Sequence, residues 1–142
     1  MIVTGIVLRA KDHFTEVLEG VGSGAGGTQR WARVAGRHVA AEVVLAGRTV
    51  DAFEARDLGL VARVVPAERV VEAATTIAAR IATGAPLALR AATASVRAAE
   101  ELPLAAALEA ERERLVAVLD TDDRVEGITA FLEKRPPRFT GR

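Results

Sequence analysis

The sequence has no cysteine and no tyrosine, and its only aromatic residues are one tryptophan and four phenylalanines among 142 residues. A chain without cysteine forms no disulfide, offers no thiolate nucleophile and builds no cysteine-ligated metal site. Its two histidines, His13 and His38, are too few and too far apart in the sequence to indicate a metal centre. We therefore expect no resident metal, and a reducing compartment such as the cytoplasm.

The chain also lacks an excess of either charge and a long apolar run. Its 19 basic and 19 acidic side chains balance, so neither a nucleic acid nor an anionic membrane is expected as its partner. The apolar segment 2–8 is too short to cross a bilayer, and it has neither the basic flank nor the cleavage site of a signal peptide. A chain of this length can bury a core, built here mostly from Ala, Val, Leu and Ile.

The first 66 residues predict short elements separated by glycines and prolines. The patterns indicate a strand over 2–8, a loop over 12–24, helices over 26–35, 38–46 and 50–58, and a second strand over 60–65. Asp51 is the expected N-cap of the third helix, and Glu54 completes a capping-box pattern with it. We expect this part, 1–66, to form one structural region.

The remaining residues, 67–142, predict a run of four amphipathic helices. Their boundaries are set by Gly84 and Pro86, by Pro103, and by Pro136 at the end of the last helix. The expected fold is therefore α/β but mostly α in this chain, with one or two short strands. The third of these helices carries a leucine stripe at 104, 108, 115 and 119, with the pairs Glu109–Arg112 and Glu111–Arg114 on its other face.

The glycine-rich segment GSGAGGTQR, 22–30, admits three interpretations. A phosphate-binding P-loop requires a lysine before the threonine, and none stands between Gly27 and Thr28. The glycines at 22, 24 and 27 match a dinucleotide-binding fingerprint, but they follow no clear strand and open no strand–helix–strand unit. A flexible linker is not expected, because organised helices follow at once. The third interpretation, a turn that leads into a helix beside an active site, rests on the resemblance described next.

Three motifs follow one another in the chain. They are GAGGTQR at 24–30, EVVLAGRTVDAFEARDLGLVARVVP at 42–66 and DDRVEGITAFLEKRPPRF at 122–139. Together they resemble the enoyl-CoA hydratase/isomerase (crotonase) family, and the resemblance runs from about Glu16 to the end of the chain. It implies a crotonase-like fold, of which this chain holds the C-terminal half. It also implies an acyl-CoA thioester as substrate, with coenzyme A as part of that substrate and no separate cofactor.

The resemblance gives two residues near the glycine segment a role. Glu16 matches the family's general acid/base, which exchanges a proton with the acyl chain beside the thioester. Gly24 matches a position whose backbone N–H faces the reacting water. Thr15 and Ser23 stand where the family has prolines. From the residues alone, Glu16 is a solvated loop carboxylate, Gly24 is part of a turn, and Glu19 is a rival carboxylate nearby.

Two residues of the last motif match family positions beside the adenine and phosphate end of coenzyme A, often of a neighbouring subunit. They are Phe131, whose ring suits a base, and Lys134, whose ammonium suits a phosphate. From the residues alone, Phe131 is equally suited to core packing, because it lies on the apolar stripe of its helix, and Lys134 to a solvated helix end.

The family also builds an oxyanion hole from two backbone N–H groups in segments upstream of these motifs. We expect neither segment within these 142 residues, so the chain alone would lack that stabilisation of an enolate. We expect self-association as a trimer or a dimer of trimers through the C-terminal helices. The expected function is hydration or isomerisation of a 2-enoyl-CoA, and the alternative is a non-catalytic remnant or an oligomerisation module of the family.

Overall fold

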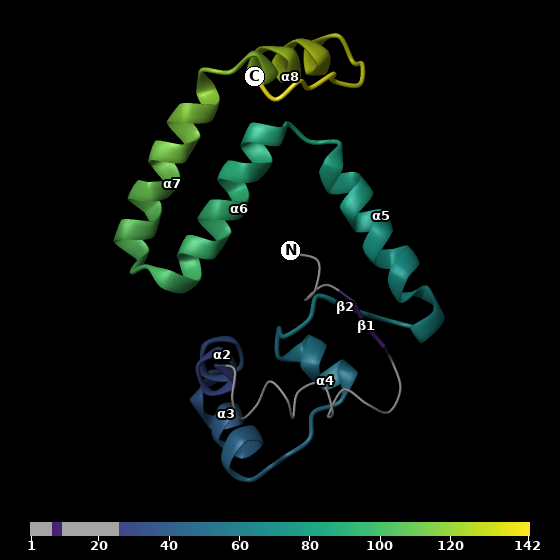
Figure 1. Cartoon of the computed structure of the whole chain (residues 1–142), viewed down its shortest axis with the longest axis vertical. Coiled ribbons are helices and arrows are strands. Elements are labelled where there is room, and N and C mark those ends of the chain that lie inside the picture. The colour runs from purple at the N-terminus through teal and green to yellow at the C-terminus, as the bar shows by residue number, and fades with distance from the viewer. Residues whose placement is uncertain (1–6, 10–25) are drawn as a thin grey trace. The chain divides into compact units, whose positions relative to one another are not determined.

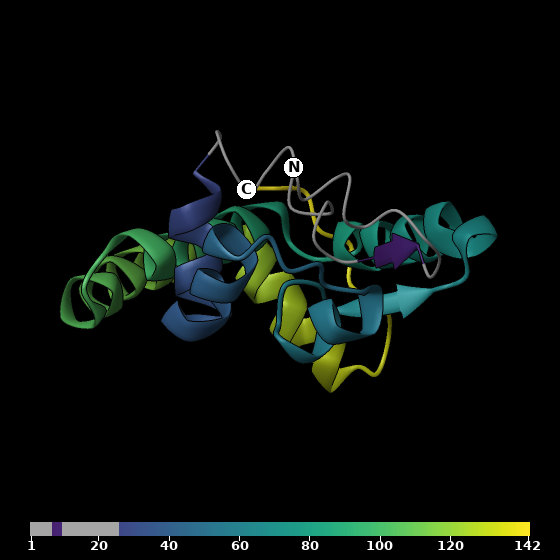
Figure 2. The same ribbon diagram turned by 90° about the horizontal axis from the view of Figure 1, so that it is seen from below.

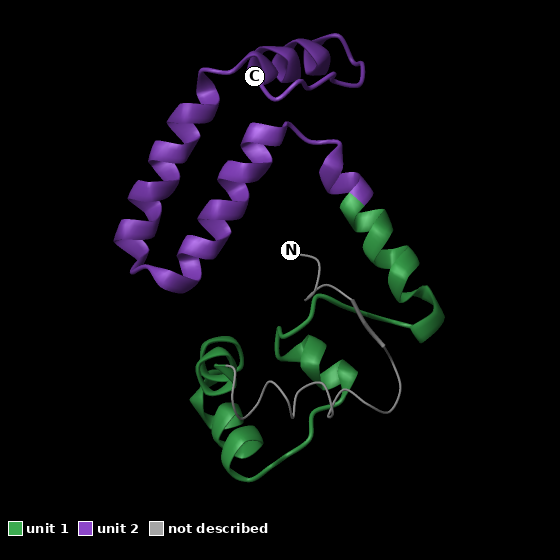
Figure 3. Ribbon diagram, in the orientation of Figure 1, with its two compact units in different colours: residues 1–78 green, residues 79–142 purple. Residues whose placement is uncertain are grey.

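The computed structural model describes residues 7–9 and 26–142, and the chain divides into two compact units, 1–78 and 79–142 (Figure 3). The sequence places a division near Pro66, whereas these units meet inside α5 (Val70–Ala82). The described parts comprise two short strands and a series of helices (Figure 1). The expected mostly helical fold is confirmed, and the predicted loop over 12–24 lies outside the described residues.

The first unit has its core around the single tryptophan. Trp31 lies on α2 (Gly27–Val34) with 2% of its surface exposed, and it packs in a cluster with residues of α3 (Gly36–Leu45) and of the segment after α3. Gly36, the first residue of α3, has a φ of 82°, a left-handed conformation that glycine adopts without steric cost. The remaining buried members of the cluster are Ala40, Val50, Ala55 and Val61.

The next helix, α4 (Ala52–Asp57), begins as the sequence predicts. The Asp51 side chain is its N-cap, because Oδ1 accepts a hydrogen bond of 2.8 Å from the Glu54 backbone N–H. The predicted reciprocal half of a capping box is not formed. The Glu54 carboxylate instead accepts two hydrogen bonds, of 2.7 and 3.0 Å, from Nη1 of Arg48, and this contact raises the pKa of Arg48 above its usual value.

A two-stranded parallel sheet completes the first unit. Strand β1 (Val7–Arg9) pairs with β2 (Arg63–Val65) in the register Val7 to Arg63, and Figure 2 shows the two arrows side by side. Pro66 ends β2, as expected, and a single 3₁₀ turn, η2 (Ala67–Arg69), leads into α5. Of the predicted strand over 2–8, residues 7 and 8 are described, and they are strand.

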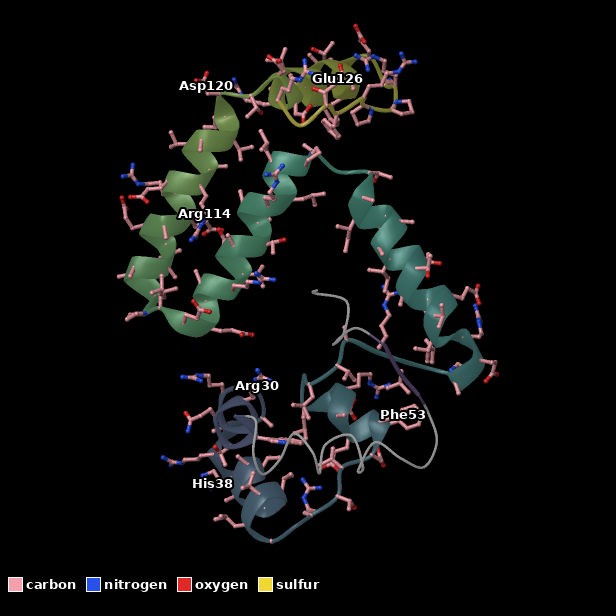
Figure 4. All side chains as sticks on the ribbon, in the orientation of Figure 1. Arg30, His38, Phe53, Arg114, Asp120 and Glu126 are labelled. Atoms are coloured by element: carbon pink, nitrogen blue, oxygen red, sulfur yellow. The ribbon has the colours of Figure 1, made fainter. Side chains whose placement is uncertain are left out.

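The second unit contains a helical hairpin. Helix α6 (Pro86–Glu101) and helix α7 (Leu104–Leu119) lie side by side (Figure 1), and proline stands at or beside the start of each. The predicted pair on α7 between Glu109 and Arg112 forms, with Nη2 and Oε1 2.7 Å apart. The predicted pair between Glu111 and Arg114 is absent from the ion pairs of the described residues. Arg114 lies between α6 and α7 (Figure 4), where its Nη1 is buried without a hydrogen-bond partner.

The predicted leucine stripe of α7 is not buried within the described chain. Leu104 is 75% exposed, and the other three leucines of the stripe are also exposed. Helix α8 (Asp122–Leu132) likewise presents exposed apolar side chains, and its N-cap is the Thr121 hydroxyl, which accepts a hydrogen bond from the Arg124 backbone N–H. Both helices therefore carry apolar side chains that the described part of the chain leaves exposed. No helix of residues 26–142 is long and apolar enough to span a membrane.

Candidate functional site

The predicted site residues fall into two groups along the chain. Glu16 and Gly24 lie outside the described residues. The helix next to them in the sequence is described: Gly26 has a φ of 82° and caps α2, which begins at Gly27. The predicted helix after the glycine segment is thus confirmed, and its first turn lies within the motif GAGGTQR.

Phe131 and Lys134 lie together at the C-terminal end of α8. Phe131 is 82% exposed, so it packs in no core of the described unit 79–142. Lys134 is also exposed, and its backbone N–H donates a 3.2 Å hydrogen bond to the carbonyl of Phe131. The negative end of the helix dipole favours a cation at this place. An aromatic face and an ammonium are thus available on one open helix end, a combination that suits a base and a phosphate group.

The backbone turn that ends α8 has the form of a Schellman motif. This motif consists of two nested backbone hydrogen bonds. The outer one runs from the Arg135 N–H to the carbonyl of Ala130 over 3.0 Å, and the inner one from the Lys134 N–H to the carbonyl of Phe131. The residue in the left-handed position of this motif is Lys134, with a φ of 55°, and it is the one residue other than glycine with a positive φ in the described chain. For a residue with a Cβ, that conformation costs about 1–2 kcal/mol.

A forked ion pair closes over this turn. Arg135 donates from Nη1 to Oε1 of Glu126 over 2.6 Å and from Nη2 to Oε2 over 2.9 Å. Its Nε donates to Glu133 over 2.6 Å, and the Arg138 backbone N–H donates to Glu126 Oε1 over 2.7 Å. The Arg135 guanidinium, followed by the Arg138 N–H, lowers the pKa of Glu126 from 4.5 to about 2. The same contacts raise the pKa of Arg135.

A second carboxylate holds the end of the tail. Asp123 is 3% exposed, and its Oδ1 and Oδ2 accept hydrogen bonds of 2.6 Å from the Thr140 N–H and 2.9 Å from the Gly141 N–H. The Asp123 backbone N–H donates to the carbonyl of Arg142 over 3.0 Å. Asp123 and Glu126 are thus one helical turn apart, and together they fasten the segment 135–142 along α8. Figure 4 labels Glu126 on this helix.

An open, polar pocket lies between the tail and α8, and neither Phe131 nor Lys134 lines it. Its walls carry charges of both signs, so it lacks the uniform charge of an anion or cation site. Within residues 26–142, no three side chains of His, Asp or Glu are grouped so that they could hold a metal ion. The pocket is lined by Asp122, Asp123, Glu126, Arg135, Pro136, Arg138, Thr140 and Arg142.

The sequence interpretation overlooked three residues of this arrangement: Asp123, Glu126 and Arg135. All three belong to the third motif, in which two carboxylates one helical turn apart precede an arginine-rich tail. That spacing puts both carboxylates on one side of a helix, so a tail that folds back along the helix could have been inferred. Nothing in the sequence specified which arginine pairs with which carboxylate.

Comparison with known proteins covers nearly the whole chain. Residues 6–142 match the family model described as enoyl-CoA hydratase/isomerase. The chain is 42% identical over 133 residues to 2,3-dehydroadipyl-CoA hydratase of Escherichia coli, covering 94% of this chain and 52% of that protein. It is 41% identical over 124 residues to the mitochondrial enoyl-CoA hydratase of Pongo abelii, covering 87% of this chain and 43% of that one.

A solved structure gives the same result. The crystal structure of an enoyl-CoA hydratase from Bacillus anthracis superimposes with a TM-score of 0.80 at 39% identity, over 90% of this chain and 50% of that chain. The chain therefore belongs to the enoyl-CoA hydratase/isomerase family and has part of the crotonase fold. It spans about half the length of the relatives that it matches.

Proposed function

We propose that the protein carrying this chain adds water to a 2-enoyl-CoA thioester, or isomerises it, through an enolate. The observation that carries the proposal is the family match over residues 6–142, together with relatives named as hydratases of enoyl-CoA and 2,3-dehydroadipyl-CoA. Coenzyme A enters as part of the substrate, and the reaction needs no further cofactor. The proposed location is the cytoplasm.

In this proposal Glu16 exchanges the proton with the acyl chain, and the Gly24 backbone N–H helps to place the water. The test compares Glu16→Gln with Glu19→Gln in the protein carrying this chain, following the loss of enoyl thioester absorbance. Both variants remove one carboxylate from the same segment, so the second controls for charge and folding. We expect turnover to be lost in Glu16→Gln and kept in Glu19→Gln. Equal turnover in both variants would remove Glu16 from the mechanism.

For the coenzyme A part of the substrate, Phe131 and Lys134 bind the adenine and phosphate end. Their exposure on one helix end supports this assignment, because both are free to meet a ligand. We also propose that these 142 residues do not themselves supply the oxyanion hole, which the family resemblance places in segments upstream of the three motifs. Two polarised N–H groups would then come from outside these 142 residues.

A second candidate function is assembly without catalysis. The exposed apolar side chains of α7, such as Leu104 and Leu108, support it, because monomeric proteins seldom expose such a row. The occupant proposed for this face is a second copy of the chain, in a trimer or a dimer of trimers. Light scattering on the purified chain tests this. A Leu104→Glu/Leu108→Glu variant should shift it to monomer, and a wild-type chain that is already monomeric would contradict it.

A further inference from the structure

The described residues 26–142 contain the same helix-ending motif at the ends of α4 and α8, with different residues in its left-handed position. At the end of α4, the Leu60 N–H bonds to the carbonyl of Ala55 over 2.9 Å, and the Gly59 N–H bonds to that of Arg56 over 3.0 Å. This is the same pair of bonds that ends α8. The left-handed position is Gly59 in α4, with a φ of 79°, and Lys134 in α8, with a φ of 55°.

Glycine is the residue that this position favours, because it has no Cβ to clash with the backbone. The first helix follows that preference and the second does not. A residue held in an unfavourable backbone conformation persists only where its surroundings determine it, and such residues gather at functional sites. The Lys134 ammonium forms no ion pair with any residue of 26–142. A salt bridge within that range therefore does not explain why a lysine occupies the left-handed position.

The side chains that surround this turn are those of Glu133 and Arg135, on either side of Lys134, and that of Glu126. Arg135 comes directly after Lys134, and its guanidinium spans from Glu126 on one side to Glu133, the residue before Lys134, on the other. Lys134 thus lies between two residues that are tied to each other. The fork thus adds side-chain contacts to the two backbone hydrogen bonds that already define the turn at Lys134.

We propose that Glu126 and Arg135 are positioning residues, which hold Lys134 in its left-handed conformation so that its ammonium meets a phosphate of coenzyme A. The inference rests on the proposed function, in which Lys134 contacts that phosphate. Neither Glu126 nor Arg135 touches the ligand. The Glu126 carboxylate is charged at neutral pH, and the Arg135 guanidinium holds its pKa at about 2, below the usual value.

The test is a double-mutant cycle on the binding of coenzyme A, measured by calorimetry with the full 142-residue chain. Arg135→Lys keeps the charge but breaks the two-pronged contact. We expect it to weaken binding roughly fivefold when Lys134 is present. In the Lys134→Gly background the same change should have less than about a twofold effect. The matched control is Arg112→Lys, which alters the equivalent Glu109–Arg112 pair on α7 and should leave affinity unchanged.

Glu126→Gln is a second test variant. The direction in which it changes the affinity for coenzyme A distinguishes positioning from simple electrostatics. It removes a negative charge, which by Coulomb's law alone strengthens the binding of an anionic ligand. Positioning predicts the opposite, a weakening of roughly fivefold. The size of the side chain and an acceptor for the Arg138 N–H are kept, so the variant should fold even where Arg135→Lys does not. Lys134→Arg should restore most of the affinity lost in Lys134→Gly.

The outcomes separate this inference from the proposed function. If Lys134→Gly binds coenzyme A as the wild type does, Lys134 makes no phosphate contact, and both ideas are overturned. If Lys134→Gly loses affinity about tenfold but Arg135→Lys and Glu126→Gln do not, the phosphate contact stands and the positioning role is overturned. If Arg135→Lys weakens the binding of coenzyme A equally with and without Lys134, the ion pair only stabilises the fold. That outcome would also overturn the positioning role.

Discussion

Asp123 and Thr140 lie 17 residues apart in the sequence and are joined by a 2.6 Å hydrogen bond from the Thr140 N–H to the Asp123 carboxylate. The same buried carboxylate accepts the Gly141 N–H. One side chain thus replaces the strand or helix partners that these backbone groups would otherwise need. The tail of the chain is held to α8 by side chains, and its order depends on a few identifiable contacts.

The first prediction concerns this contact. Asp123→Ala leaves two backbone donors without their acceptor, and we expect a loss of about 2 kcal/mol in the free energy of unfolding of the tail and α8. Amide hydrogen exchange at Thr140 and Gly141 measures it directly. Asp122→Ala is the matched control, because Asp122 is the neighbouring exposed carboxylate in the same helical turn. Equal protection of the tail amides in both variants would contradict the assignment.

A second prediction arises from the low pKa of Glu126. Arg135 lowers that pKa from 4.5 to about 2, so the folded state binds this proton less readily than the unfolded state. The stabilisation is complete above about pH 4.5 and is lost as the pH falls towards 2. Carboxyl NMR of Glu126 should show a midpoint near 2 in the folded chain. In Glu126→Gln the stability should change less over this range, and a midpoint above 4 would contradict the ion pair.

The two helix-ending motifs predict opposite effects of substitution. Gly59→Ala places a Cβ at a φ of 79° and should destabilise the chain by about 1 kcal/mol. Lys134→Gly relieves the same strain and should leave stability unchanged or raise it by up to about 1 kcal/mol. Thermal unfolding followed by circular dichroism measures both. A marked loss of stability in Lys134→Gly would show that the lysine serves the fold rather than a ligand.

The core of the first unit depends on its single tryptophan. Trp31 is almost fully buried among small and branched side chains, so Trp31→Ala should cost about 3–5 kcal/mol. Phe53 supplies the control: it is 55% exposed and contacts Arg56 through the face of its ring, and Phe53→Ala should cost no more than about 1 kcal/mol. Chemical denaturation of the two variants tests this, and similar midpoints would contradict the burial of Trp31.

Local rules predicted most of the secondary structure. The Asp51 cap, the proline beside each hairpin helix and the glycines between the short helices all act within a few residues, so the sequence specifies them. The position of the leucine stripe was also predictable, but not its exposure, because burial depends on surfaces from elsewhere. The pairing of Glu126 with Arg135 was missed since it depends on how the tail turns back after Lys134.

The candidate site shows the same limit. The resemblance singled out Phe131 and Lys134, and the periodicity of α8 left Phe131 equally suited to a core. Its exposure decides against packing in a core of the described unit 79–142. The left-handed backbone of Lys134 had no sequence signal, because the motif that ends a helix is expected to contain glycine. Glu16 and Gly24 remain predictions, since they lie outside the described residues.

The most direct test compares two substrates that differ only at the end assigned to α8: a 2-enoyl-CoA and the same enoyl thioester of pantetheine, which lacks the adenosine and its phosphates. Turnover by the protein carrying this chain is measured for the wild type, Phe131→Ala and Lys134→Gly. We predict a KM for the CoA substrate raised roughly tenfold by either substitution, with kcat little changed, and no change for the pantetheine substrate. Equal effects on both substrates, or no turnover of either by the wild type, would contradict the proposed function and the role of α8 in it.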